Sequence, residues 1–157
     1  MFENVKMPEG MNPEVLEHLM NPKNYGKLDD ADGVGVALDE KTKEYVIFYT
    51  KLDGDIIENV KFATNGCQDT VVIGSMFTQM ILGNDTNYAN TAVQKIHDKL
   101  GKLSAQQQVC ADIVFTAFLA SLKNYENKQN GEDEELHVLK MKESCQVEQT
   151  DEGKENE

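Results

Sequence analysis

The fold is decided by the stretch IIENVKFATNGCQDTVVIGSMFTQMI, residues 56–81, because its hydrophobic period changes halfway along. Residues 56–63 alternate apolar and polar side chains, which is typical of a half-buried strand. After Asn65 and Gly66 the apolar residues recur at helical spacing, in a wide stripe formed by Val72, Ile73, Met76, Phe77, Met80 and Ile81. The stretch therefore predicts a strand that passes directly into an amphipathic helix, with Cys67 at the corner.

Two further strands are expected upstream of this one. Residues 34–38 alternate large and small side chains, and residues 45–49 form a β-branched and aromatic run. Asp53 and Gly54 are a strong hairpin-turn signal between the second and third strands. Short connections between three consecutive strands predict an antiparallel sheet.

Helices account for most of the remaining sequence. A short helix is expected over residues 11–20, capped by Asn12 and ended by Pro22. Another covers residues 88–100, and a third begins at the capping-box pair Ser104 and Gln107 and runs to about residue 125. Strands followed by helices predict an α+β fold, with a three-stranded antiparallel sheet packed against a layer of C-terminal helices and a short N-terminal helix.

Composition divides the chain into a domain over residues 1–126 and an acidic, mostly disordered tail over residues 127–157. Within the tail, residues 136–141 could form a brief ordered element. The net charge of −13 repels phosphate backbones and anionic lipids, so we expect neither nucleic acid nor membrane as a partner. The N-terminus lacks the layout of a signal peptide, and no apolar run is long enough to span a bilayer; we therefore expect a cytoplasmic protein.

The three cysteines are Cys67, Cys110 and Cys145, and none belongs to a C-x-x-C pair. Cys67 at a helix start suits a metal ligand or a reactive thiol, because free N–H groups there stabilise a thiolate; a small buried residue would fit equally well. Cys110 shares an apolar stripe with Val114, Ala117 and Phe118, so its spacing alone favours a core residue. Cys145 lies in the polar tail, where we expect an exposed thiol.

Other chemical signals are weak. The histidines, His18, His97 and His137, have no partner at metal-ligand spacing and are expected to be structural or surface residues. Gly33 and Gly35 are separated by one residue, but the nucleotide-binding fingerprint does not follow them, and no P-loop or G-x-S-x-G motif occurs.

Three short segments of the sequence resemble those of one known family. Residues 21–29, NPKNYGKLD, look like an N-P-x-N-x-G segment that follows the family's first helix. Residues 56–67 are similar to its strand that leads to a second cysteine, and Cys110 lies where its third cysteine begins the last long helix. Over residues 11–125 the chain thus resembles the U-type iron–sulfur cluster scaffolds, IscU and the N-terminal domain of NifU.

The resemblance implies a site of three cysteines, an aspartate two residues after the first cysteine, and a histidine just before the third. Residues 41–44 contain no cysteine, and the aspartate position falls on Lys43 or Glu44. The histidine position is Val109, and residues 104–108 replace the family's proline-rich chaperone-binding segment. Cys67 and Cys110 remain as the implied cluster or metal ligands, with Glu44 as a candidate oxygen ligand.

By this resemblance the chain is a scaffold or carrier that binds iron or an Fe–S cluster, foremost [2Fe–2S], with zinc as the alternative metal. It implies a cysteine desulfurase and other Fe–S assembly proteins as partners, and no enzymatic activity of its own. Because two cysteines cannot complete a cluster's ligand set, a homodimer could supply four thiolates. Two alternatives stay open: a diverged adaptor that binds no cluster, and thiol-based sulfur transfer through Cys67.

Overall fold

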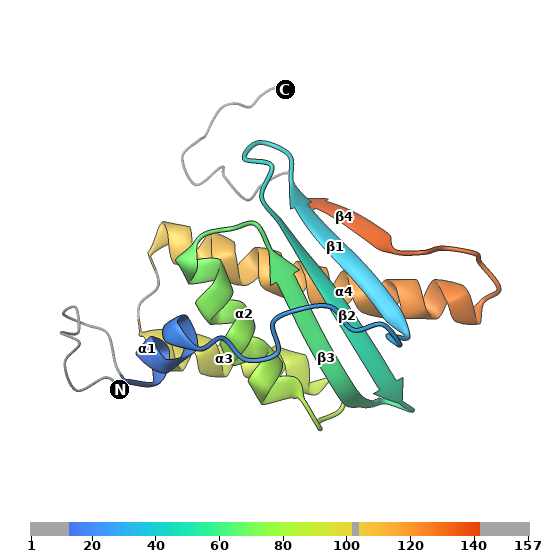
Figure 1. The fold of residues 1–157 in the computed structure, drawn as a ribbon, viewed down its shortest axis with the longest axis horizontal. Helices are drawn as coiled ribbons and strands as arrows, with labels where there is room; N and C mark the ends of the chain where they lie inside the picture. Colours follow the sequence, from blue (N-terminus) through green and yellow to red (C-terminus); the bar gives the residue numbers. More distant parts are fainter. Residues whose placement is uncertain (1–12, 102–103, 142–157) are drawn as a thin grey trace.

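The computed structural model describes residues 13–101 and 104–141, and they form an α+β fold in which a sheet packs against helices (Figure 1). The elements follow in the order α1 (Pro13–Met20), β1 (Gly33–Asp39), β2 (Tyr45–Asp53), β3 (Ile56–Thr64), α2 (Gln68–Ile81), α3 (Tyr88–Leu100), α4 (Ala105–Gln129) and β4 (His137–Met141). The predicted fold class is confirmed. No helix in the described part of the chain combines the length and apolar character that crossing a bilayer requires.

The sheet has four strands in the order β3-β2-β1-β4, one more than predicted. The β1–β2 and β2–β3 pairs are antiparallel as expected, whereas β4 pairs with β1 in parallel. The expected boundary at residue 126 is also too early, because α4 continues to Gln129 and the brief ordered element over residues 136–141 is β4. This strand was hard to predict because it lies at the sheet edge, where no side chain is fully buried and polar residues are tolerated. Residues 142–157, with Cys145, lie outside the described residues, as does the expected cap Asn12.

The backbone of α4 rests directly on β1. A Cβ atom on Gly35 would lie 2.1 Å from the backbone nitrogen of Ser121, and one on Gly33 would lie 2.1 Å from the carbonyl oxygen of Ser121. The Ser121 hydroxyl also forms a buried hydrogen bond of 2.9 Å with Thr50 on β2. These two glycines therefore permit a close approach of helix and strand that no larger residue allows.

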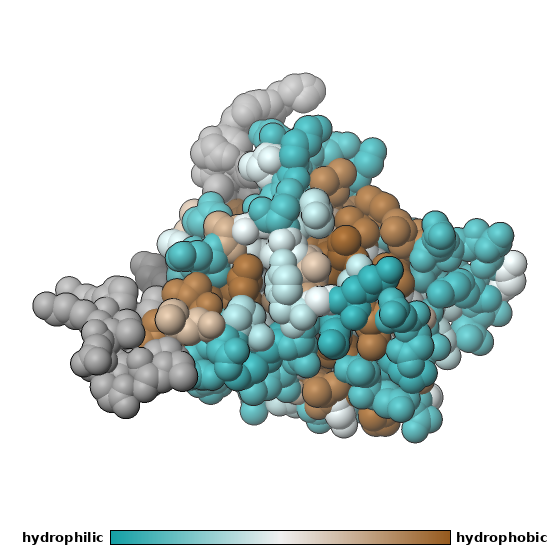
Figure 2. All heavy atoms as spheres, viewed as in Figure 1, coloured by the Kyte–Doolittle hydropathy of each residue, from teal (hydrophilic) through white to brown (hydrophobic). Residues whose placement is uncertain are grey.

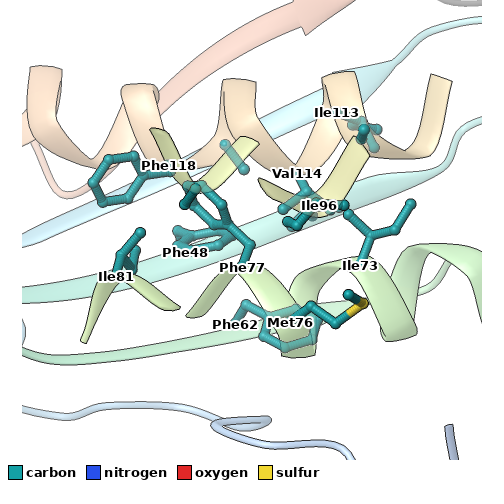
Figure 3. Close-up of a cluster of buried hydrophobic side chains, with 14 of the residues drawn as sticks. Phe48, Phe62, Ile73, Met76, Phe77, Ile81, Ile96, Ile113, Val114 and Phe118 are labelled. Atoms are coloured by element: carbon teal, nitrogen blue, oxygen red, sulfur yellow. The ribbon is translucent and has the colours of Figure 1, made fainter. Parts of the chain in front are cut away.

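Four phenylalanines join the sheet to the helices. Phe48 and Phe62 on the strands are stacked at a centroid distance of 6.0 Å, and Phe77 of α2 meets Phe118 of α4 edge-on at 5.5 Å. Figure 3 shows these rings at the centre of a buried cluster between the sheet, α2 and α4. None of the described helices lies on the opposite face of the sheet, where apolar residues gather between hydrophilic margins (Figure 2).

The segment after α1 fastens that helix to the rest of the domain. Lys23 donates its backbone N–H to the Ser75 hydroxyl, which also bonds to the Nδ1 atom of buried His18. Asn24 has a left-handed backbone, with φ of +57°, and donates its side-chain amide to Thr78. Burial lowers the pKa of His18, as expected for a neutral structural histidine. The segment at residues 21–29, which resembles the family, thus has a structural role.

Helix α4 begins with the predicted capping box. The Ser104 hydroxyl accepts a hydrogen bond from the Gln107 backbone N–H at 3.1 Å, and the Gln107 side chain accepts one from the Ser104 backbone N–H. This cap fixes the first turn of the helix that carries Cys110.

At its other end α4 holds the connection to β4. Asn124 and Asn127 donate their side-chain amides to the Glu134 carboxylate, which also contacts His137 Nδ1 at 3.0 Å. Asn124 in addition accepts a hydrogen bond from the backbone of Val34 on β1. The bond with His137, followed by those with Asn127 and Asn124, lowers the pKa of Glu134 to about 2.

Replacing Gly35 by alanine should destabilise the domain by roughly 2–4 kcal/mol, because the new methyl group meets helix backbone, which can yield only if α4 moves. Chemical denaturation followed by circular dichroism measures this. Val36→Ala, on the opposite face of the same strand, is the control and should cost roughly 1 kcal/mol. Equal losses for the two variants would show that the close approach is not a constraint.

The Glu134 network should make the stability contributed by β4 docking sensitive to acid. Since folding lowers the pKa of Glu134 from 4.5 to about 2, this contribution is complete above pH 4.5 and is lost as the pH falls toward 2. We expect the stability difference between the wild type and Glu134→Gln to narrow across that window, measured by denaturation at a series of pH values. A difference that stays constant from pH 6 to pH 2.5 would contradict the role given to the carboxylate.

Candidate functional site

The structure brings two cysteines together that are 43 positions apart in the sequence. Cys67 is the N-cap residue of α2, and Cys110 lies in the second turn of α4. Their Sγ atoms are 4.0 Å apart. Both were expected to contribute to one site, and their helices converge at this corner because α2 and α4 share the core described above.

The corner before Cys67 is built by hydrogen bonds of the β3 end. The Thr64 hydroxyl donates to the carbonyl of Tyr45 and accepts from the backbone N–H of Gly66. The Glu44 carboxylate lies over Gly66, where a Cβ atom would meet it, so a larger residue would require that side chain to move. The Cys67 carbonyl then accepts from the backbone N–H groups of Thr70 and Val71, which starts α2.

Of the two candidates for the aspartate position, Glu44 is the one that reaches the site. Its carboxylate accepts a hydrogen bond of 2.7 Å from the Thr70 hydroxyl, which lies 4.0 Å from Cys67 Sγ. Lys43 is exposed and has a left-handed backbone, with φ of +66°. If Glu44 takes the aspartate position, the missing first cysteine corresponds to Thr42, two residues earlier.

The turn that contains these residues is tied to the cysteine corner by one side chain. Asn65 accepts a hydrogen bond from the backbone N–H of Tyr45 and donates one to the carbonyl of Lys43. Residues 42–45 are thereby held beside the corner at Gly66 and Cys67.

Gln106 is a site residue that the sequence analysis did not identify. Its Nε2 atom donates to both sulfurs, at 3.5 Å from Cys110 and 3.8 Å from Cys67. It precedes Cys110 by four residues on a helix, and that spacing alone could have indicated a shared face. Val109, at the expected histidine position, is a buried aliphatic residue and offers no ring nitrogen.

The two thiols differ in their environment. Cys67 is exposed, whereas Cys110 is 1% exposed. Burial, with smaller contributions from Cys67 and Glu44, raises the pKa of Cys110 to about 12. Cys110 therefore remains protonated at neutral pH, and Cys67 is the sulfur that an external reactant meets first.

The described residues of one chain provide only part of a metal site. Within residues 13–101 and 104–141, no three or more histidine, cysteine, aspartate or glutamate side chains converge as metal ligands. Glu44, the candidate oxygen ligand, is instead hydrogen-bonded to Thr70. The donor set that the described residues offer is two sulfurs, which suits soft metal ions but leaves a four-ligand site half filled.

Fold and site together define a class of protein: a small α+β domain that presents a cysteine pair at a corner between its sheet and its helices. The model of the NifU-like N terminal domain matches residues 11–132. The chain belongs to this family.

Individual relatives agree with the family assignment. The chain is 34% identical over 126 residues to the iron–sulfur cluster assembly scaffold protein IscU of Aquifex aeolicus, covering 78% of this chain and 80% of that one. It is 37% identical over 76 residues to the zinc-dependent sulfurtransferase SufU of Bacillus subtilis, covering 48% and 50%. The crystal structure of a NifU-like N-terminal protein from Brucella abortus shares the fold, with a TM-score of 0.60 at 14% identity over 74% of this chain and 94% of that one.

The difference between the thiols predicts selective alkylation. At pH 7, iodoacetamide should modify Cys67 in the folded protein and leave Cys110 unmodified, because a pKa of about 12 reduces the Cys110 thiolate fraction roughly a thousandfold from that of an ordinary thiol. Peptide mass spectrometry measures both sites. The same protein in guanidinium chloride is the control, in which both cysteines should react. Similar rates at the two sites in the folded protein would contradict the predicted burial.

Proposed function

We propose that this chain is an iron–sulfur cluster assembly scaffold or carrier that holds its cargo through Cys67 and Cys110. The single observation that carries the proposal is the 4.0 Å separation of their sulfurs at a corner where one of them is exposed. Two thiolates at that distance can bind one iron atom together. The similarity to a protein named as an IscU scaffold supports the same function.

A complete [2Fe–2S] cluster requires a second chain. Such a cluster usually has four cysteine ligands, and one chain supplies two. A symmetric homodimer would bring the missing two, because a two-fold axis repeats the same pair on the partner. Zinc could occupy the same thiolates. In this proposal the protein works in the cytoplasm with a cysteine desulfurase and other assembly proteins, and it catalyses no reaction itself.

Sulfur transfer is a second candidate function that a specific observation favours. The chain is similar over about half its length to a protein named as a sulfurtransferase, and Cys67 is an exposed thiol that a sulfur donor can reach. An adaptor that binds no cluster is a third candidate, consistent with the non-ligand residues Thr42 and Val109 at two expected ligand positions.

Anaerobic reconstitution with iron and sulfide tests cluster binding. We expect the wild type to develop visible absorbance and to contain about two irons and two sulfides per dimer. Cys67→Ser and Cys110→Ser should each lose this absorbance, because each removes two of four ligands from the dimer. Cys145→Ser is the matched control and should behave like the wild type. If the wild type binds no iron and a desulfurase still co-purifies with the double variant, the adaptor candidate is correct.

Adding a third thiol to the site provides a second test of metal binding. Thr42→Cys adds a sulfur in the turn that Asn65 holds beside the cysteine corner, so it should slow the loss of bound metal to a chelator roughly tenfold. Lys43→Cys places a thiol one residue away on an exposed, left-handed backbone and is the matched control. An equal gain from both variants would show that Thr42 is not the position of the missing ligand.

A further inference from the structure

The cysteine pair is asymmetric in a way that cluster binding does not use. Of the two thiols, Cys67 is exposed and Cys110 is 1% exposed. A reactant that arrives from solvent can reach Cys67, while Cys110 lies on the buried side of Cys67. This arrangement is suited to a two-step reaction in which the first thiol accepts a group and the second displaces part of it.

The distance between the sulfurs suits the second step. At 4.0 Å, the two Sγ atoms are near van der Waals contact, and a disulfide bond of about 2.05 Å requires them to approach by roughly 2 Å. Side-chain rotation at the exposed cysteine can supply a movement of that size. Cys110 Sγ approaches Cys67 Sγ from the protein interior. A group that leaves from the opposite side of Cys67 Sγ therefore departs into solvent.

We propose that Cys110 resolves a persulfide carried on Cys67 and releases its outer sulfur as sulfide. This inference rests on the proposed function in one respect, that sulfur reaches the chain as a persulfide or polysulfide. Cys110 Sγ attacks Cys67 Sγ, and the bond between Cys67 Sγ and the outer sulfur breaks as the new S–S bond forms. The outer sulfur leaves with the bonding electron pair and takes the Cys110 proton, giving hydrogen sulfide and a Cys67–Cys110 disulfide.

The electrons balance without an outside reductant in this turnover. The Cys110 sulfur rises from oxidation state −2 to −1 as the disulfide forms, the outer sulfur falls from −1 to −2 as it becomes sulfide, and the Cys67 sulfur stays at −1. A second turnover requires a dithiol reductant to reopen the disulfide. The step therefore converts delivered sulfur into the oxidation state that an Fe–S cluster contains.

Gln106 is placed to assist this exchange. Its amide nitrogen donates to both sulfurs, so it contacts the attacking and the attacked atom at once. During the displacement, negative charge passes from Cys110 Sγ through Cys67 Sγ to the outer sulfur, and an N–H donor shared by the first two atoms can stabilise it on its way. Gln106 is thus a positioning residue for the pair.

Loading the reduced protein with inorganic polysulfide tests the proposal, without oxygen or any other thiol and with rapid desalting afterwards. The wild type should lose about 2 Da by intact mass, show the Cys67–Cys110 disulfide in its peptide map, and release about one sulfide per chain. Cys110→Ser should instead gain about 32 Da on Cys67 and release no sulfide. Cys67→Ser should form no Cys67–Cys110 disulfide, gain no sulfur at position 67 and release no sulfide. Cys145→Ser should behave like the wild type.

A wild type that keeps its outer sulfur on Cys67, with no disulfide, overturns the inference, and this measurement requires no variant to fold. Cys110→Ala, which adds no hydroxyl to the core, should give the same result as Cys110→Ser. Gln106→Leu should load normally and release sulfide at least about fivefold more slowly, whereas Gln108→Leu, whose side chain bonds Asp112 and not the sulfurs, should not change the rate. Equal release rates for these two variants would exclude the role given to Gln106.

Failure of the inference and failure of the proposed function give different results. If the persulfide persists but a cluster forms on reconstitution, only the inference is wrong. If sulfide and disulfide appear but no cluster forms, the chain releases sulfur and does not hold a cluster through this pair.

Discussion

The contact between the α4 backbone and the glycines of β1 is the constraint on which the rest of the structure depends. Because Gly33 and Gly35 have no side chain, the helix lies against the strand at the level of Ser121, closer than any larger residue at these positions would allow. This contact sets the positions of the functional side chains along α4. Toward its start lies Cys110, and toward its end lie the two asparagines that hold the connection to β4.

The candidate site follows from that placement together with the corner after β3. Helix α2 begins at Cys67 because the strand ends in a corner that Thr64 holds through the Gly66 backbone N–H, after which the Cys67 carbonyl starts the helix. The phenylalanine cluster then holds α2 against α4, so the distance between the two sulfurs is set by apolar packing far larger than the site itself. The geometry of the candidate site is therefore fixed by the core.

The sequence was sufficient to predict the helices and strands whose hydrophobic periodicity is strong. The change of period at Asn65 and Gly66 located both β3 and α2, and the Ser104–Gln107 capping box located the start of α4. Strand β4 was underestimated because an edge strand buries too little to impose an apolar pattern, and its parallel pairing depends on where α4 ends. Gly33 and Gly35 were considered only as a possible nucleotide motif, since the close approach they permit depends on Ser121, which lies 88 and 86 positions later in the chain.

Within the site, sequence reasoning identified the two cysteines but not their relation. Periodicity alone favoured a core role for Cys110, and the structure shows that it is buried and in contact with a second sulfur at the same time. The choice between Lys43 and Glu44 could not be made from spacing, because one inserted residue shifts the turn; the hydrogen bonds of Asn65 and Thr70 distinguish them. Gln106 was missed because an exposed glutamine carries no chemical signature until its partners are known.

Among the expected ligands that this chain lacks, the first cysteine falls outside the packed core, and this has a chemical consequence. The absent first cysteine belongs to an exposed turn that two hydrogen bonds hold, whereas Cys67 and Cys110 belong to helices that the core fixes. A substitution in the turn removes a ligand at little structural cost, because Thr42 is exposed. What remains is a dithiol whose separation the fold maintains. A pair of that kind has lost the coordination number for holding metal within one chain, but it retains everything that an exchange between two sulfurs requires.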